Sequence, residues 1–252
     1  LTSVDPSKMV LREQAQTELM KTFLRRSASG ELRWTYALFP TNAYAQDAEM
    51  SLSEYEDFAY GSCLPDMNDP VGYWQRFSAR QQKVVDWLKG KESLHVVGPD
   101  TDLRVGIAGR PFINCDGHYN MPDGEVFTGP VEDSLEGRAF FSYPAIYGGR
   151  EVTGVRLWFE KGRVVKASAE KNQDFLLKTL DTDAGSRYVG EFAIGTNEGI
   201  RRATREILFD EKITGSFHMA LGAGYPESGS RNESAIHWDM VSDLRRGAEI
   251  RA

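Results

Sequence analysis

The sequence predicts an α+β fold in which a largely antiparallel or mixed sheet is flanked by helices. Two observations predict it. Helical patterns fill the first 92 residues, and strand patterns with hairpin turns prevail from residue 93 onward, with few regular alternations between the two. A doubly wound parallel sheet needs strands and helices in alternation, so this order favours antiparallel pairing. We expect a mainly helical leading region, 1–92, packed on an α+β region, 93–252.

Three helices are predicted in the leading region. Residues 9–24 place apolar side chains near helical spacing, and SLSEYEDF, residues 51–58, opens with a capping-box pattern. A third helix begins at Asp69-Pro70 and stops at Gly90, because proline suits a first helical turn and glycine a helix end. The apolar stripes of these helices indicate core packing rather than ligand binding.

Hairpins and one further helix are predicted in the second region. Residues 94–109 read as two strands around the turn 98–100, and residues 154–170 read as two strands around the turn 160–162. A helix over 172–183 follows, before a glycine-rich final third of mixed character.

Composition and charge exclude several classes of partner. The 37 acidic against 30 basic side chains give a net charge of -7, which disfavours binding to nucleic acid or to anionic membranes. No apolar run has the length of a membrane span, and the first residues lack a signal-peptide core, so a cytoplasmic location is expected. Cys63 and Cys115 lack CxxC spacing and are expected to be free thiols. Leu1 in place of Met suggests a fragment or a processed product.

The segment SAIHWDMV shows a pattern of chemical interest. In a strand, alternate residues share a face. Ile236, Trp238 and Met240 would therefore point into one layer, while His237 and Asp239 project together from the other. A histidine held by its neighbouring aspartate on a solvated face is the alternative interpretation of this segment alone.

Three further segments repeat this logic. In SFHMALG, His218 lies between small residues on the face opposite the apolar ones, and in YVGEFAIG, Glu191 shares a face with Val189 and Ala193. A lone carboxylate in such a strand carries a desolvation cost unless a cation pairs with it. In NMPDGEVFTGP, Glu125 follows a turn and precedes an apolar pair.

Together the segments offer three carboxylates and two imidazoles: Glu125, Glu191, His218, His237 and Asp239. This donor set suits zinc, cobalt or manganese. Five ligands can hold two ions if at least one ligand is shared, which leaves positions open for water, as in hydrolytic sites. HExxH and GxSxG motifs and Walker spacing are absent. The pattern thus argues against the common zinc-protease arrangement, against Ser134 as a nucleophile and against phosphate binding, while His95 and His118 are read as structural or surface residues.

The same segments resemble the signature stretches of the aminopeptidase T and aminopeptidase S metallopeptidase family. The resemblance extends to the stretches MSLSEYEDF, VVGPDTDL, FSYPAIYGGREVTGVRL and GAGYPE, and it covers essentially the whole chain. It implies a broad-specificity, cytoplasmic, dimeric exopeptidase that uses two divalent metals and acts on peptides with a free N-terminus. The family's ligand pattern falls on the five residues named above, and it gives weight to Tyr225. The family's additional N-terminal domain has no counterpart before Leu1, so reduced activity of this chain is expected.

The predicted two-metal site suggests a mechanistic role for several residues. Glu191 is expected to bridge the metals, Glu211 to act as general base and Tyr225 to hydrogen-bond the oxyanion or complete a metal shell. A salt bridge with Lys212 or a surface position is the alternative for Glu211, and a core tyrosine in a turn the alternative for Tyr225. Two competing functions remain open. One is another two-metal hydrolase such as a phosphoesterase, and the other is a non-catalytic fragment that retains the fold.

Overall fold

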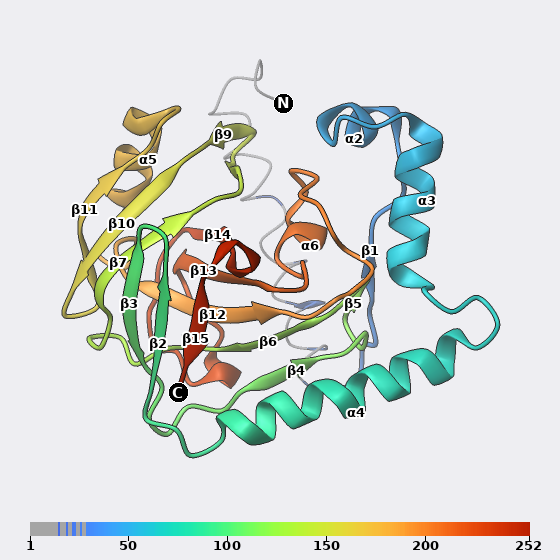
Figure 1. Cartoon of the computed structure of the whole chain (residues 1–252), viewed down its shortest axis with the longest axis horizontal. Helices are drawn as coiled ribbons and strands as arrows, with labels where there is room; N and C mark the ends of the chain where they lie inside the picture. The colour runs from blue at the N-terminus through green and yellow to red at the C-terminus, as the bar shows by residue number, and fades with distance from the viewer. Residues whose placement is uncertain (1–14, 16–18, 20–21, 24–25, 27–28) are drawn as a thin grey trace. The chain divides into compact units, whose positions relative to one another are not determined.

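The computed structural model describes residues 15, 19, 22, 23, 26 and 29–252 (Figure 1). The chain divides into two compact units, Leu1–Tyr36 and Ala37–Ala252, and the second holds helices α2 to α6 and the two large sheets described below. The helix predicted over 9–24 lies largely outside the described residues. The division of the chain at residue 93 stays a prediction.

The helices predicted from residues 51 and 69 begin where the sequence signals place them, and the helix predicted over 172–183 is shorter at its end, Gln173–Leu180. Ser51 caps α3 through a capping box, since its hydroxyl accepts from Glu54 N and the Glu54 carboxylate accepts from Ser51 N at 2.8 Å. Asp69 caps α4 by accepting from Gly72 N at 3.0 Å. The helices are α2 (Asn42–Asp47), α3 (Leu52–Cys63), α4 (Pro70–Leu88), α5 (Gln173–Leu180) and α6 (Ile207–Asp210), with short 3-10 turns η1 (Pro226–Ser228) and η2 (Leu244–Arg246).

The strands form two large antiparallel sheets and confirm the predicted α+β class. One sheet has the order β11-β10-β7-β3-β2-β15 and the other the order β14-β13-β12-β6-β4, while β8 pairs with β9. The bounds are β1 (Tyr36–Ala37), β2 (Ser93–Gly98), β3 (Thr101–Gly106), β4 (Ile113–Cys115), β5 (Asn120–Met121), β6 (Glu125–Thr128), β7 (Glu136–Phe141), β8 (Ala145–Tyr147), β9 (Arg150–Val152), β10 (Val155–Glu160), β11 (Arg163–Ser168), β12 (Val189–Gly195), β13 (Ser216–Gly222), β14 (His237–Asp243) and β15 (Glu249–Arg251).

Both predicted hairpins are present. β2 pairs with β3 through a turn in which Asp100 has φ 56°, and β10 pairs with β11 through a turn in which Lys161 and Gly162 have φ 48° and 76°. Aspartate and glycine tolerate the left-handed region better than most residues do, which explains their places in these turns.

The two large sheets share one hydrophobic core. Side chains from both sheets and from α5 are fully buried in it, and the Phe217 ring lies 6.0 Å from Phe141 of the other sheet and 5.9 Å from Phe192 of its own. Burial of each such side chain contributes about 1.5–3 kcal/mol. This core fixes the inner face of the five-stranded sheet and leaves its other face for chemistry.

Helices cover part of that other face (Figure 1). A smaller core around Tyr55 joins α2, α3 and α6, with Phe58 and Phe209 packed against its ring. α4 lies along β4, where the buried Gln81 Nε2 donates to Asn114 Oδ1 at 2.5 Å and to Cys115 O at 2.9 Å.

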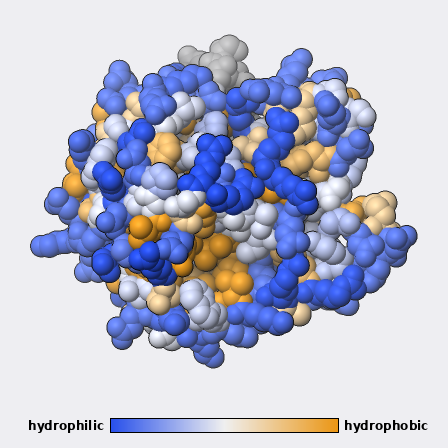
Figure 2. Space-filling view, in the orientation of Figure 1, coloured by the Kyte–Doolittle hydropathy of each residue, from blue (hydrophilic) through white to orange (hydrophobic). Residues whose placement is uncertain are grey.

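On the face drawn in Figure 2, hydrophilic side chains surround a hollowed area in which hydrophobic ones gather. In the part of the chain that the structure describes, no helix is both long and apolar enough to cross a membrane.

Candidate functional site

Four neighbouring strands of the five-stranded sheet carry the predicted metal ligands. β6 supplies Glu125, β12 Glu191, β13 His218, and β14 both His237 and Asp239. Their strand neighbours Val126, Phe192, Phe217, Met219, Trp238 and Met240 lie in the shared core. The alternation that the sequence predicted therefore holds, and the ligands project from the opposite face of the sheet.

Val189 differs from the prediction that it shares a face with Glu191. It lies in the hydrophobic core, because the register of β12 against β13 shifts between Val189 and Glu191. Gly190 occupies the irregular position, where an added Cβ would meet Ala223 O at 2.4 Å. The bulge moves Val189 to the inner face and leaves Glu191 on the site face.

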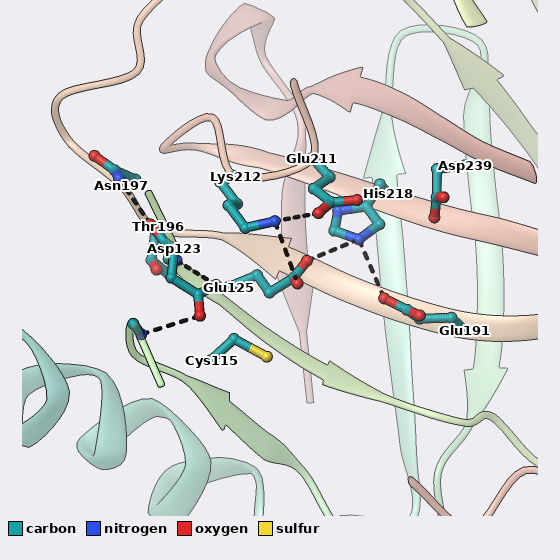
Figure 3. A network of polar contacts seen from close by, with 12 residues as sticks. Cys115, Asp123, Glu125, Glu191, Thr196, Asn197, Glu211, Lys212, His218 and Asp239 are labelled. Carbon is teal, nitrogen blue, oxygen red and sulfur yellow. Dashed lines mark hydrogen bonds and ion pairs between the residues drawn. The ribbon is translucent and has the colours of Figure 1, made fainter. Parts of the chain in front are cut away.

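The five side chains form one continuous series of contacts, of which Figure 3 shows those of His218 with Glu125 and Glu191. His218 Nε2 lies 3.1 Å from Glu125 Oε2 and 3.3 Å from Glu191 Oε1. The second carboxylate oxygen of Glu191 lies 3.9 Å from His237 Nε2, which is 3.5 Å from Asp239 Oδ2. Glu191 thus turns one oxygen toward each histidine.

Two groups of possible ligands overlap at Glu191. Ligand atoms of Glu125, Glu191 and His218 lie within 4.8 Å of one another, and so do those of Glu191, His237 and Asp239. A carboxylate shared between two such groups has the arrangement of a bridging ligand in a two-metal site.

His237 is oriented by the backbone. Its Nδ1 lies 2.7 Å from Ala223 O, and a carbonyl only accepts, so Nδ1 carries the proton. Nε2 is then the ring nitrogen that faces Glu191 and Asp239. Metal-binding histidines commonly have this hydrogen bond on the other ring nitrogen, because it fixes tautomer and ring orientation.

Unsatisfied polar atoms support a cation at this site. Glu125 Oε2, Asp239 Oδ1 and His218 Nδ1 are buried and have no well-directed hydrogen bond within the described chain. Buried carboxylate oxygens are costly without a partner. Two of these three atoms belong to carboxylates of the overlapping groups, so the donor set fits divalent ions there.

Glu211 and Lys212 adjoin the ligands at the end of α6. Glu211 is largely buried and pairs with Lys212, as the alternative interpretation held, and its carboxylate also lies within 4.8 Å of ligand atoms of His218 and Asp239. Burial raises the pKa of Glu211 to about 8, although the Lys212 ammonium lowers it. Burial would also raise the pKa of Glu125, but Lys212 and His218 lower it to about 2.

Tyr225 borders the site instead of lying in the core. Its ring centre is 5.3 Å from that of His237 and 5.7 Å from that of Phe127, and 45% of the residue is exposed. Burial and the charges of Glu191 and Asp239 raise the pKa of its hydroxyl, so it stays a donor near neutral pH.

A neighbouring group was missed by the sequence analysis. Ligand atoms of Cys115, Asp123 and Glu125 lie within 4.8 Å of one another. Asp123 accepts from Gly117 N and Gly124 N at 3.0 Å each, which accounts for both its oxygens. We assign it a structural role in shaping the turn before Glu125.

The remaining candidates lie away from the site chemistry. His95 pairs with Asp102 at 2.7 Å, and His118 pairs with Asp116 at 2.5 Å. Ser134 Oγ donates to Val131 O at 2.6 Å. These contacts agree with structural roles, and both cysteines are free.

Comparison with known proteins places this chain in a family. The model of the thermophilic metalloprotease family (M29) matches residues 1–249. The chain belongs to this family. The predicted family and the enzyme class, a metal-dependent hydrolase that acts on peptides, are thereby confirmed.

Relatives of this M29 chain carry aminopeptidase names. It is 29% identical to aminopeptidase T of Thermus thermophilus over 96% of this chain and 67% of that protein, and 28% identical to aminopeptidase AmpS of Bacillus subtilis over the same shares. The solved structure of wild-type AmpT from Thermus thermophilus superposes with a TM-score of 0.80 at 26% identity, covering 99% of this chain and 71% of that one. A 2,5-dihydroxypyridine dioxygenase from Pseudomonas putida, 18% identical with a TM-score of 0.58 over 69% of this chain and 56% of that one, shares the fold.

Proposed function

We propose that this M29 protein is a metal-dependent aminopeptidase that hydrolyses the first peptide bond of peptides with a free N-terminus. The observation that carries the proposal is the position of Glu191, whose two carboxylate oxygens face two different histidines. The names of the relatives support the same activity.

Two divalent ions, zinc, cobalt or manganese, would be held by Glu125, Glu191, His218, His237 and Asp239, with Glu191 shared. Ions at such sites lower the pKa of water, polarise the scissile carbonyl and receive the free amine of the substrate. The protein itself would orient these ligands. The hydrogen bond from His237 Nδ1 to Ala223 O keeps Nε2 aimed at Glu191 and Asp239.

Glu211 is the proposed general base. Burial raises the pKa of the Glu211 carboxyl to about 8, so its ionised form is a stronger base toward an attacking water than an exposed carboxylate, and it would then deliver the proton to the leaving amine. Tyr225, whose raised pKa keeps its hydroxyl protonated, would donate to the oxygen of the tetrahedral oxyanion.

Other parts of the proposal concern the context of the enzyme. We propose a cytoplasmic homodimer. A phosphoesterase is less well supported, because the cation in contact with the site carboxylates, Lys212, is fully buried and pairs with Glu211. Phosphate recognition favours Arg and Lys side chains that reach the substrate.

Metal analysis tests the assignment of the site. Protein purified without chelators should contain up to two divalent ions per chain, and His218→Ala and His237→Ala should each lower this content. Unchanged metal content in both variants would refute the ligand assignment. His95→Ala is a matched control, because this histidine pairs with Asp102 on the other sheet.

Product analysis tests the specificity. Mass spectrometry of digests should show residues released one at a time from free N-termini and N-acetylated peptides left intact, because acetylation removes the basic lone pair of the amine. Equal cleavage of free and acetylated peptides would refute the exopeptidase reading. Hydrolysis of a phosphate ester in place of peptides would favour the phosphoesterase.

A further inference from the structure

Lys212 is fully buried beside the candidate metal ligands. Its side chain is 0% exposed, its ammonium contacts Glu211 Oε1, and it lies 3.7 Å from Glu125 Oε1 (Figure 3). A buried ammonium is costly unless carboxylates surround it, so this placement calls for a reason.

The backbone holds Lys212 in place independently of these ion pairs. Its N–H donates to Phe209 O and its carbonyl accepts from Asn197 N, both at 3.0 Å. The end of α6 and the segment after β12 therefore fix the origin of the side chain. From this fixed origin the side chain places its ammonium beside the carboxylates of Glu211 and Glu125.

The two carboxylate oxygens of Glu125 face different partners. Oε1 faces the ammonium, whereas Oε2 faces His218 Nε2 at 3.1 Å and lacks a well-directed hydrogen bond. An ammonium only donates, so it holds an acceptor atom toward itself. The carboxylate is thereby kept from rotating both oxygens toward the other ligands.

We propose that Lys212 is a positioning residue that makes Glu125 a single-oxygen metal ligand. This inference rests on the proposed function, because it takes Glu125 as a ligand. The ammonium occupies Oε1 and leaves Oε2 for the ion, which keeps one coordination position open for water or substrate. The same ammonium holds Glu211 Oε1, so one cation sets the orientation of both a ligand and the proposed base.

The charge of Lys212 suits this role. Burial alone would lower its pKa, but Glu125 and Glu211 raise it on balance, so the side chain stays a cation. Outer carboxylate and cation partners of metal ligands typically change metal affinity by about 10- to 100-fold when they are removed.

The proposed role of Lys212 predicts a specific result for the substitution Glu125→Gln. An amide has one acceptor and one donor end, and Lys212 would attract the oxygen, turning the NH2 group toward the ion. Glu125→Gln should therefore lose metal affinity even though an amide oxygen is itself a competent ligand. With Lys212→Met added, the amide is free to turn its oxygen toward the ion.

The experiment is a titration of metal-free protein with Co²⁺, followed by its visible absorption, for the wild type, Lys212→Met, Glu125→Gln and the double variant. We expect the visible bands of Lys212→Met to weaken, because a second oxygen of Glu125 raises the coordination number. We expect the double variant to bind Co²⁺ at least about tenfold more tightly than Glu125→Gln, the lower end of the usual effect of outer partners. An unchanged Lys212→Met spectrum, or a double variant that binds no more tightly than Glu125→Gln, overturns the proposal.

Controls separate this role from a structural one. Lys171→Met removes an exposed lysine that pairs with Glu151, changes the net charge equally, and should leave the spectrum unchanged. If Lys212→Met does not fold, Lys212→Leu, which also lacks a donor, replaces it in both comparisons, with the same expected results. Glu125→Gln also tests the proposal without any Lys212 variant, since wild-type Co²⁺ affinity in Glu125→Gln refutes it.

His218→Ala distinguishes the failure of this inference from the failure of the proposed function. If His218→Ala loses Co²⁺ while Glu125→Gln keeps it, the metal site stands and only the role of Lys212 is refuted. If His218→Ala keeps wild-type Co²⁺ binding, the ligand set itself is wrong, and the role of Lys212 is refuted with it.

Discussion

Glu211→Gln separates the proposed base from the ligands. The amide has nearly the same shape as the carboxylate, and its oxygen still accepts from Lys212, which contacts Glu211 Oε1. The second partner of Lys212, Glu125 at 3.7 Å, is also retained. We therefore expect the variant to fold and to keep its metals, while it loses the group that accepts a proton.

The expected loss of kcat follows from the usual contribution of general acid–base catalysis to the rate. Such transfer contributes about 100- to 10,000-fold, so kcat should fall by at least about 100-fold while KM changes little. A 100-fold loss corresponds to about 2.7 kcal/mol in activation free energy. Hydrolysis of an amino-acid nitroanilide gives kcat and KM, and elemental analysis of the same sample gives metal content.

Two results would refute the reasoning for Glu211. Turnover within tenfold of the wild type would move the base role to another group. Loss of metal would make Glu211 a ligand, an outcome consistent with its position within 4.8 Å of ligand atoms of His218 and Asp239. Glu206→Gln is the matched control, because this carboxylate lies near Tyr55 in the smaller core and should leave turnover unchanged.

Three further predictions concern stability. Phe192→Ala should lower the free energy of unfolding by about 3–5 kcal/mol in urea titrations, because this fully buried ring packs between the sheets, and a loss below about 1 kcal/mol would contradict the packing. Asp183 accepts from Ala235 N, Ser234 Oγ and Ser186 Oγ, and these bonds lower its pKa to about 2. The ionised Asp183 carboxylate should therefore stabilise the fold above about pH 4, and this stabilisation should be lost as the pH falls toward 2. Asp183→Asn should lower Tm at pH 7 and flatten the dependence of Tm on pH between 4 and 2. An unchanged profile would contradict the assignment. Saturation with Co²⁺ at about 100 times Kd should add about 2.7 kcal/mol to stability, measured as a rise in Tm that EDTA reverses, and a Tm insensitive to metal would contradict binding to the folded state.

The strands of the site could be predicted well, because each alternates polar and apolar side chains over a half-buried sheet. His218 between Phe217 and Met219, and Asp239 between Trp238 and Met240, leave little choice of face once a strand is assumed. The hairpins and helix caps were equally accessible, since they depend on residues close in sequence.

Other features depend on contacts between distant segments and left no local signal. The bulge at Gly190 lies where Ala223 O approaches the strand, a contact that no pattern within β12 reveals. The burial of Lys212 is similar, because a lysine beside a glutamate reads as a surface pair until Glu125 from a distant strand is placed 3.7 Å away. The order of strands, in which β6 joins β12, likewise arises only from tertiary pairing.

The placement of the candidate ligands on paired strands constrains how the sequence can change in length. Unless a bulge absorbs it, as at Gly190, one inserted or deleted residue within β12, β13 or β14 reverses the faces of the residues beyond it, sending ligands into the core and core side chains into the site. Such a change would remove stability and metal binding together. Length variation among proteins of this kind should therefore concentrate in connections such as the segment between β13 and β14, where an added residue moves neither face of the sheet.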